Sequence, residues 1–350
     1  MKIVVVTTHV PFVYGGAEIH AKQLCLALQN YGHKCEVVKI PFKWYPAEKI
    51  LDHIFICRLL DLTESCGESI DMLIGLKFPA YYVKHPNKIL WILHQHKSAY
   101  ELWLHPEYGD LSIQPNGKLV REAIISADKK FIPEAKKVFA NSKTVAERLK
   151  KFCGLDSIPL YHPPLYADKF YCGSQQGDYF FYPSRINKMK RQRLVIEALR
   201  YCKQPVKVLF AGLPEAEVYL KELKKRAEEL GVSKNIKWVG FISEEEKRKL
   251  YADSLGVIYV PYDEDYGYVT LEAMLAGKPT ITCTDAGGPL EFVVDGITGF
   301  ISEPTPQSLA EKLDMLYENK VKAKEMGKNA YLKYHEMKIS WNKVVETLLK

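Results

Sequence analysis

Short apolar runs alternate with segments of helical periodicity along most of the chain. The first run, Lys2–Thr8, is rich in β-branched residues and predicts a strand. Between Ala17 and Tyr31 apolar residues recur every three to four positions, which predicts a helix that Gly32 ends. Further strands in the first half are predicted at Cys35–Ile40, Asp71–Gly75, Ile89–Leu93 and Lys137–Ala140. This order predicts a parallel sheet covered by helices on both faces.

The second half of the chain repeats the alternation. Strands are predicted at Tyr179–Pro183, Val206–Ala211, Ile236–Val239, Gly256–Val260 and Pro279–Cys283. Helices are predicted at Gln192–Tyr201, Glu215–Leu230, Ser243–Ala252, Val269–Ala276, Gly288–Val294 and from Thr305-Pro306 to about Tyr317. Two doubly wound α/β domains in tandem follow from this repetition, and ligands of such sheets bind beyond the carboxyl ends of the strands.

The domain boundary is predicted in the stretch Ser157–Asp168, because it contains three prolines and no periodicity. We therefore expect an N-terminal domain over residues 1–160 and a C-terminal domain over residues 161–335. A closing helix over residues 336–350, capped by Ser340, is expected to pack back on the N-terminal domain. Thr144 and Glu147 have the spacing of a capping box for a helix that ends near Phe152.

Composition narrows the class of protein. Of 350 residues, 47% are hydrophobic and 26% are charged, as in an ordinary globular protein, which excludes a disordered or low-complexity chain. Apolar runs fall far short of the ~18 residues that span a bilayer, and the start of the chain has no cleavage signal of a secreted protein. Eight cysteines without a C-x-x-C pair predict buried thiols in a reducing cytoplasm.

Positive charge is concentrated in one part of the chain. The net charge is +7, and residues 118–151 alone carry ten Lys or Arg against four Asp or Glu. Such a stretch can contact nucleic acid, anionic lipid or an anionic substrate, or it can simply be a solvated helix face. The charge count alone leaves these alternatives open.

Two loops after predicted strands contain candidate anion-binding groups. Gly15 and Gly16 precede the first helix, where backbone amides can approach an anion, although the pair is also typical of a tight turn. It forms neither a G-x-G-x-x-G fingerprint nor a P-loop. Arg185 and Lys190 follow the first strand of the second half and could clamp a diphosphate, unless the loop is merely exposed and basic.

The most informative pattern runs from Asp263 to Met274. Glu264 lies in a loop and Glu272 lies eight residues later in the next helix, a spacing suited to binding sugar hydroxyls. Gly267 allows the backbone to approach a ligand, and the amides at the helix start would point at phosphate. These are the amides of Tyr268, Val269 and Thr270. The alternative is an acidic surface loop before a helix.

Two histidines, His94 and His96, directly follow a predicted strand, where a side chain can act as a base or donate to a charged oxygen. A single such histidine is more often structural. His, Cys and Asp residues nowhere have the spacing of metal ligands, so we expect no metal site.

These motifs together resemble the retaining glycosyltransferases of family four, which have the GT-B fold. The resemblance covers nearly the whole chain and is most specific at Glu264 to Glu272, which continues through Ala276-Gly277-Lys278-Pro279 and Gly287-Gly288-Pro289. It implies two Rossmann-like domains that face each other across a cleft.

The resemblance implies a role for each matched residue. Gly16 would contact the donor phosphate, Arg185 and Lys190 would bind the diphosphate, Glu264 would hold the transferred sugar and Glu272 the ribose. His94 would lie near the reacting sugar, and His96 on the acceptor side. Two departures from the family pattern are Asp265-Tyr266 in place of Gly-Phe, and Arg191 in place of Gly after Lys190. The second departure leaves open whether Lys188 or Lys190 is the clamp.

The implied activity is transfer of a sugar from a nucleotide-diphosphate sugar, such as a UDP- or GDP-sugar, to a hydroxyl, with retention and without a metal or other cofactor. Alternatives are an epimerase of the same fold and a non-catalytic nucleotide-sugar-binding subunit. We expect a glycan or lipid-linked acceptor and no nucleic acid. We also expect a cytoplasmic protein that contacts anionic membrane peripherally through residues 118–151 and the aromatic residues Trp44, Tyr45, Tyr100 and Trp103.

Overall fold

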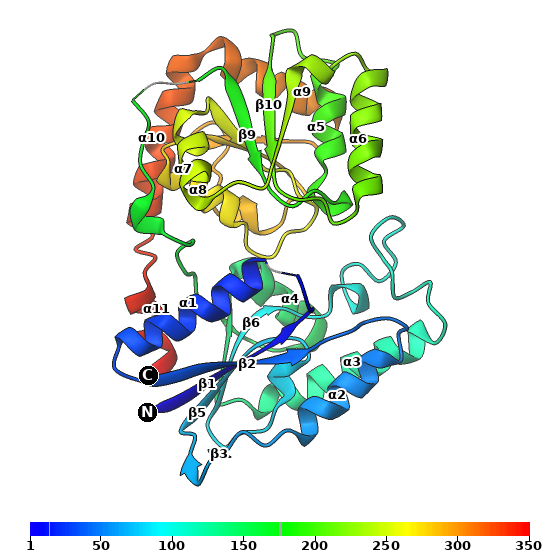
Figure 1. Ribbon diagram of the computed structural model, residues 1–350, viewed down its shortest axis with the longest axis vertical. Coiled ribbons are helices and arrows are strands. Elements are labelled where there is room, and N and C mark those ends of the chain that lie inside the picture. The colour runs from blue at the N-terminus through cyan, green and yellow to red at the C-terminus, as the bar shows by residue number, and fades with distance from the viewer. Residues whose placement is uncertain (14, 175–176) are drawn as a thin grey trace. The chain divides into compact units, whose positions relative to one another are not determined.

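The computed structural model describes residues 1–13, 15–174 and 177–350, and the chain divides into two compact units (Figure 1). Unit 1 comprises Met1–Leu165 together with Ser340–Lys350, and unit 2 comprises Tyr166–Ile339. The chain therefore leaves unit 1 within the proline-rich stretch and returns to it for the last helix.

Unit 1 contains a six-stranded sheet in the order β2-β1-β5-β6-β7-β8, with every pair parallel. Its strands are β1 (Lys2–His9), β2 (Lys34–Pro41), β5 (Met72–Lys77), β6 (Lys88–His94), β7 (Lys137–Ala140) and β8 (Ile158–Pro159). Its helices are α1 (Gly16–Asn30), α2 (Lys49–Leu59), α3 (Gly117–Phe131), α4 (Lys143–Cys153) and α11 (Trp341–Leu349). A small antiparallel hairpin pairs β3 (Glu64–Ser65) with β4 (Glu68–Ser69).

Alternating residues of β1 show how the sheet of unit 1 is covered. Val4 and Val6 pack into a cluster with residues of α2, α3 and α4, whereas Ile3 and Val5 pack into a second cluster with residues of α1 and α11. Because side chains alternate along a strand, the two clusters lie on opposite faces of the sheet. The β-branched run is thus buried on both sides, as expected for a parallel strand.

A cluster of four aromatic rings attaches the closing helix to unit 1. Trp341, the first residue of α11, stacks on His162 with ring centroids 5.6 Å apart, and both rings contact His20 of α1 and Trp91 of β6. His20 Nδ1 lies 2.7 Å from His162 Nε2, and the Trp91 indole donates to the Leu160 carbonyl at 3.2 Å. Since the cluster joins both places where the chain crosses between units, it fixes the ends of both crossing segments on unit 1.

This cluster predicts that unit 1 loses stability in mild acid. Burial lowers the pKa of His162 to about 3 and holds the pKa of His20 well below its usual value. A group whose folded pKa lies below its unfolded pKa stabilises the fold above the unfolded pKa, about 6.5 for histidine, and this stabilisation is lost as pH falls toward the folded pKa. Each such histidine steepens the loss by up to about 1.4 kcal/mol per pH unit.

The test is urea unfolding between pH 7 and pH 4, monitored by tryptophan fluorescence, to which Trp91 and Trp341 of the cluster contribute. His162→Phe preserves the stacking on Trp341, and we expect its free energy of unfolding to fall less steeply with decreasing pH than that of the wild type. His335→Gln, at an exposed position in unit 2, is the control and should keep the wild-type slope. Equal slopes in the wild type and His162→Phe would contradict the prediction.

Unit 2 contains a second parallel six-stranded sheet, in the order β11-β10-β9-β12-β13-β14. Its strands are β9 (Tyr179–Pro183), β10 (Lys207–Ala211), β11 (Ile236–Gly240), β12 (Gly256–Ile258), β13 (Thr280–Cys283) and β14 (Gly299–Ser302). Its helices are α5 (Gln192–Leu199), α6 (Glu217–Glu229), α7 (Glu244–Asp253), α8 (Tyr268–Leu275), α9 (Pro306–Glu318) and α10 (Lys320–Glu336).

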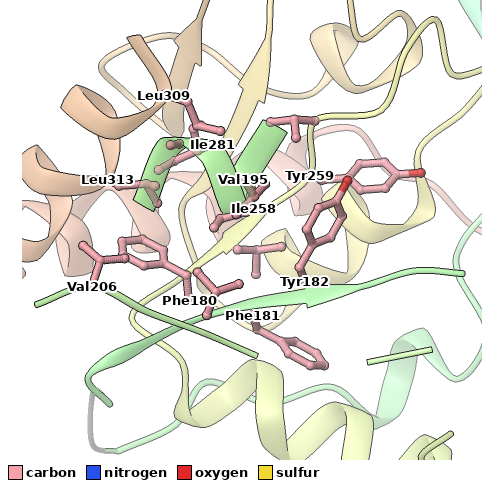
Figure 2. Packing of buried hydrophobic residues seen from close by; sticks show 14 of the residues in the cluster. Phe180, Phe181, Tyr182, Val195, Val206, Ile258, Tyr259, Ile281, Leu309 and Leu313 are labelled. Carbon is pink, nitrogen blue, oxygen red and sulfur yellow. The ribbon is translucent and has the colours of Figure 1, made fainter. Parts of the chain in front are cut away.

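One continuous apolar core holds unit 2 together. Helix α5 packs against α6 and α9, while α8 packs against α10 (Figure 1). Figure 2 shows Phe180 of β9 and Ile258 of β12 packed among side chains from α5 and α9. Because β9 and β12 lie in the middle of this core, their positions relative to each other are firmly fixed.

The structure corrects several sequence predictions. Ser142, not Thr144, caps α4, and its hydroxyl accepts from the Val145 amide at 3.1 Å; Glu147 lies exposed on the helix and closes no capping box. The predicted helix Gly288–Val294 is a single 3₁₀ turn, η7 (Gly288–Glu291). The proline-rich stretch is not wholly linker, since β8 within it pairs with β7. Four of the eight cysteines are buried, and Cys66 and Cys172 are exposed.

Candidate active site in unit 2

The strand order of unit 2 reverses between β9 and β12. From β9 the chain proceeds to β10 and β11 on one side, whereas β12, β13 and β14 continue on the other side. The loops that leave the carboxyl ends of β9 and β12 must therefore diverge, and this is the position at which open α/β sheets commonly have a ligand-binding crevice. Residues 184–191 and 259–267 lie in these two loops.

Lys190 and Glu264 meet at this crevice. The Lys190 ammonium forms an ion pair with the Glu264 carboxylate and donates to the Tyr259 hydroxyl at 3.1 Å. The two charged side chains retain 15% and 23% exposure, so the pair can be reached by a ligand. Lys188, in the same turn η5 (Lys188–Lys190), is exposed. The structure thus brings Lys190, and not Lys188, next to Glu264.

Two tyrosines form hydrogen bonds with Lys190. Tyr182, at the end of β9, donates through its hydroxyl to the Lys190 carbonyl, and Tyr259 receives the ammonium. Their rings lie edge to face with centroids 6.2 Å apart (Figure 2). Burial, followed by the charge of Glu264, raises the pKa of Tyr259 well above its usual value, so that its hydroxyl stays protonated. Asn187 also caps the turn by accepting from the Lys190 amide at 3.0 Å.

The Glu264 loop is fixed by a tight contact with the loop after β13. The Glu264 amide donates to the Ala286 carbonyl and the Gly288 amide donates to the Glu264 carbonyl, both at 2.8 Å. Gly287 has a φ of 74°, and a Cβ there would lie 2.5 Å from the Glu264 carbonyl oxygen. Only glycine fits this position, which explains the Gly287-Gly288 motif as a backbone requirement of the site.

Glu272 is held by two partners that the motif does not contain. Its side chain lies in α8, is almost fully buried, and accepts from Lys247 Nζ at 2.9 Å and from the Tyr251 hydroxyl at 2.8 Å. Lys247 also pairs with Glu244 at 2.8 Å. Burial lowers the pKa of Lys247, but the carboxylates of Glu272 and Glu244 outweigh this effect and raise it, so the lysine remains charged. The carboxylate of Glu272 is therefore fixed in orientation.

At the start of α8, one of the backbone amides predicted to bind phosphate already donates to a carbonyl of the same turn. Gly267, the N-cap, has a φ of 93°, and a Cβ there would lie 3.0 Å from the Pro289 ring. The Thr270 amide donates to the Gly267 carbonyl at 3.0 Å, so of the three amides predicted to meet a phosphate this one is occupied within the turn. Tyr268 and Val269 are the other two residues predicted for that role.

Arg185 lies in a different environment from Lys190. Its guanidinium pairs with Glu215 at 2.7 Å, and both side chains are about half exposed. A diphosphate clamp that used Arg185 would therefore require it to leave Glu215. The structure itself brings Lys190 and Glu264 together but places Arg185 in a surface ion pair.

In unit 1 the Glu18 side chain caps the start of α1 by accepting from the backbone. The Gly15 amide donates to the Glu18 carboxylate at 2.9 Å, and Gly16 begins α1. His9, at the end of β1, lies 3.8 Å from the same carboxylate. An acid thus lies in the first turn of α1, and an incoming anion at Gly16 would have to be accommodated beside Glu18.

His94 and His96 lie at the end of β6 in contrasting surroundings. His94 is partly exposed, and its Nδ1 donates to the Gln95 carbonyl at 2.7 Å. His96 packs edge-on against Phe78 at 5.1 Å between ring centroids, and burial lowers its pKa to about 4. His96 is therefore neutral at physiological pH.

Gln95, between the two histidines, connects this turn to a buried carboxylate. Its side-chain amide donates to Asp128 at 3.0 Å, and Asp128 also accepts from the hydroxyls of Tyr81, Tyr82 and Tyr100 at 2.6–2.8 Å. Burial raises the pKa of Asp128, whereas the four donors oppose that rise. No sequence pattern predicted this cluster, because its members come from four separate elements. In the described residues, no group of His, Cys, Asp or Glu is placed to hold a metal ion.

Residues 173–333 match the protein family described as "Glycosyl transferases group 1". The α-1,3/1,6-mannosyltransferase ALG2 of Dictyostelium discoideum is 39% identical over 118 residues, which are 34% of this chain and 28% of that protein. The D-rhamnosyltransferase WbpZ of Pseudomonas aeruginosa is 23% identical over 340 residues, 94% of this chain and 80% of that protein. The match to the mannosyltransferase thus spans only about a quarter of that protein's length.

Among solved structures, the fold is similar to Anabaena HepE, crystallised with UDP and glucose. The TM-score is 0.72 at 18% identity, and the similarity covers all of both chains. At this identity the likeness shows the fold alone, which is GT-B, with two parallel Rossmann-like sheets.

Proposed function

We propose that the chain transfers a sugar from a nucleotide-diphosphate sugar to a hydroxyl acceptor in glycan synthesis, because residues 173–333 match the group 1 glycosyl transferases and the whole chain has the GT-B fold. The observation that carries the proposal is the Lys190–Glu264 ion pair at the strand-order reversal of unit 2. In our proposal the Lys190 ammonium meets the leaving diphosphate, and the adjacent Glu264 carboxylate accepts from sugar hydroxyls.

The geometry supports a defined role for each group. A lysine ammonium has three protons, and Glu264 and Tyr259 account for two of them. The third can reach an oxygen of the donor diphosphate while the ammonium stays fixed. As the bond to the sugar breaks, negative charge develops on that diphosphate, and a preorganised cation stabilises it. This is the source of catalysis that we propose, and it requires no metal.

The remaining contacts concern the ends of the donor. Glu272, oriented by Lys247 and Tyr251, accepts from the ribose hydroxyls, and the α8 amides after Gly267 support the phosphate. Gly16 contacts the donor phosphate and His94 lies near the reacting sugar, by the correspondence of motifs. We assign no covalent nucleophile. Retention at the anomeric carbon is part of the proposal, and the donor is a UDP- or GDP-sugar.

Donor-only incubation separates this function from its alternatives. With EDTA present we expect slow release of the free sugar and the nucleoside diphosphate, since water can replace the acceptor. An epimerase would instead yield a nucleotide-linked sugar of changed configuration, and a binding subunit would yield no product. Complete loss of activity with EDTA, restored by a divalent metal, would contradict the metal-independent mechanism.

We also propose that unit 1 contacts anionic membrane and that the acceptor is a glycan or a lipid-linked glycan. Lys129, Lys130, Lys136 and Lys137 are all exposed. Phe55 of α2, 64% exposed, lines a groove of about 450 Å³ together with Lys84 and Lys130. Leu59, at the end of α2, is 66% exposed. Tyr100, in contrast to its predicted surface role, is buried on Asp128. Among the described residues no helix is long and apolar enough to cross a membrane.

Vesicle sedimentation tests the membrane contact. At low salt we expect binding to phosphatidylcholine vesicles that contain phosphatidylglycerol and little binding to phosphatidylcholine alone, since each basic residue contributes about 1 kcal/mol near an anionic surface. Changing Lys129, Lys130, Lys136 and Lys137 to Gln should abolish the difference. A matched control changes four exposed lysines of unit 2, Lys221, Lys224, Lys225 and Lys234. Equal loss in both variants would contradict a specific surface on unit 1.

A further inference from the structure

The Arg191 guanidinium joins three loops of the candidate site. Its Nε donates to the Val260 carbonyl and its Nη2 to the Pro261 carbonyl, both at 2.7 Å. Its two terminal nitrogens also donate to the two oxygens of Asp285, at 2.9 and 2.7 Å. The Arg191 side chain is only 12% exposed. Such a paired, planar arrangement fixes distance and orientation together.

Two of the three loops carry the Lys190–Glu264–Tyr259 cluster, and the loop after β13 holds the backbone of Glu264. Arg191 directly follows Lys190, and Val260 directly follows Tyr259. Asp285 precedes Ala286, whose carbonyl receives the Glu264 amide, and the Asp285 carbonyl receives the Asp263 amide at 3.0 Å. One guanidinium therefore links the backbone next to Lys190 and Tyr259 to the loop that holds the backbone of Glu264.

Arg191 makes these contacts from an unfavourable backbone conformation. Its φ is 51°, in the left-handed region that glycine adopts most easily, and it is the residue from which α5 starts. Glycine would fit this conformation with less strain but could make none of the side-chain hydrogen bonds. The chain thus has a conformationally unfavourable residue at a point where its side chain connects the site.

We propose that Arg191, held by Asp285, is a positioning residue that sets the separation of the Lys190 ammonium and the Glu264 carboxylate. The role rests on the proposed function, in which that ammonium meets the leaving diphosphate. Without the link, strands β9, β12 and β13 stay in place, but the loops that follow them can shift relative to one another. Because a cation stabilises developing charge only at short range, the shift lowers the rate more than it lowers donor binding.

Steady-state kinetics of Arg191→Gln, Arg191→Gly and Asp285→Asn test the role, measured well below the unfolding temperature of each. We expect kcat to fall about 10- to 30-fold in each variant, with the donor KM changed less than about threefold. The double variant Arg191→Gln/Asp285→Asn should have a kcat no lower than either single variant, because both substitutions break the same Arg191–Asp285 contact. Arg193→Gln is the control, since Arg193 is an exposed arginine whose partner is Glu197, and it should retain wild-type kcat.

A second readout does not depend on turnover. The rate at which acetic anhydride modifies Lys190, followed by mass spectrometry, should rise several-fold in Arg191→Gln and remain unchanged in Arg193→Gln, because the lysine is less firmly held by Glu264 and Tyr259. Faster modification in a protein that turns over no nucleotide sugar would uphold the positioning role and contradict the proposed function. Unchanged modification, or variants that lose only thermal stability while kcat stays at the wild-type value, would overturn the positioning role.

Discussion

Replacing Lys190 with methionine is expected to lower turnover at least about a hundredfold, while binding of the nucleoside diphosphate weakens much less. Methionine preserves most of the aliphatic side chain but removes the charge that faces the leaving diphosphate. A preorganised charge contributes mainly where charge develops in the transition state, so the loss falls on kcat. A hundredfold loss corresponds to about 2.7 kcal/mol of transition-state stabilisation. Steady-state kinetics with the donor, together with calorimetry of nucleotide binding, measures the two effects separately.

Lys188→Met is the matched control, because this lysine lies two residues away in the same turn and is exposed. It should leave kcat near the wild-type value. If Lys188→Met were instead the damaging change, the assignment of the clamp would be wrong. Arg185→Ala belongs in the same series. The sequence predicts a loss of similar size, and a normal rate would show that Arg185 stays with Glu215 during turnover.

Glu272→Gln is expected to weaken nucleotide binding about 10- to 150-fold without unfolding the protein. The carboxylate is proposed to accept from ribose hydroxyls, and hydrogen bonds to a charged group contribute about 1.5–3 kcal/mol. Glutamine keeps the shape of the side chain and can still accept from Tyr251, so the buried hydroxyl is not left unpaired. Calorimetric titration with the nucleoside diphosphate measures the change, and circular dichroism checks the fold.

Glu244→Gln is the control for Glu272. It removes the other carboxylate that contacts Lys247 but lies outside the proposed ribose site. Its nucleotide affinity should stay within about threefold of the wild type. An unchanged affinity in Glu272→Gln would contradict the ribose assignment, and equal weakening in both variants would assign the effect to Lys247 instead.

The central strands could be predicted from sequence because they are short apolar runs bounded by loops. Several helices could not. Apolar residues of α2 surround the helix instead of forming one stripe, since Ile50 and Cys57 are buried while Phe55 and Leu59 are exposed. Helix α10 packs through small residues, with Gly327 against the backbone of Gly277, so its apolar stripe is weak. Strand β8 has only two residues, one of them a proline.

At the site, the sequence identified residues within one loop or one helix turn. Glu264, Gly267 and Glu272 have a spacing that is visible along the chain, and so do Lys188 and Lys190. The residues that hold them come from elsewhere. Tyr259 contacts Lys190 only because β9 and β12 are neighbours in the sheet although far apart in sequence. Arg191 likewise departs from the glycine of the family pattern, and its contacts with Val260, Pro261 and Asp285 depend on loops that are far apart in the sequence.

The most direct test of the proposed function is release of nucleoside diphosphate from a panel of UDP-, GDP- and ADP-sugars by the purified protein. We predict that sugars of one nucleotide are turned over in the presence of EDTA, that Lys190→Met abolishes this release, and that Lys188→Met does not. If no donor of the panel were turned over, or if Lys190→Met released nucleoside diphosphate as fast as the wild type, the account would be contradicted.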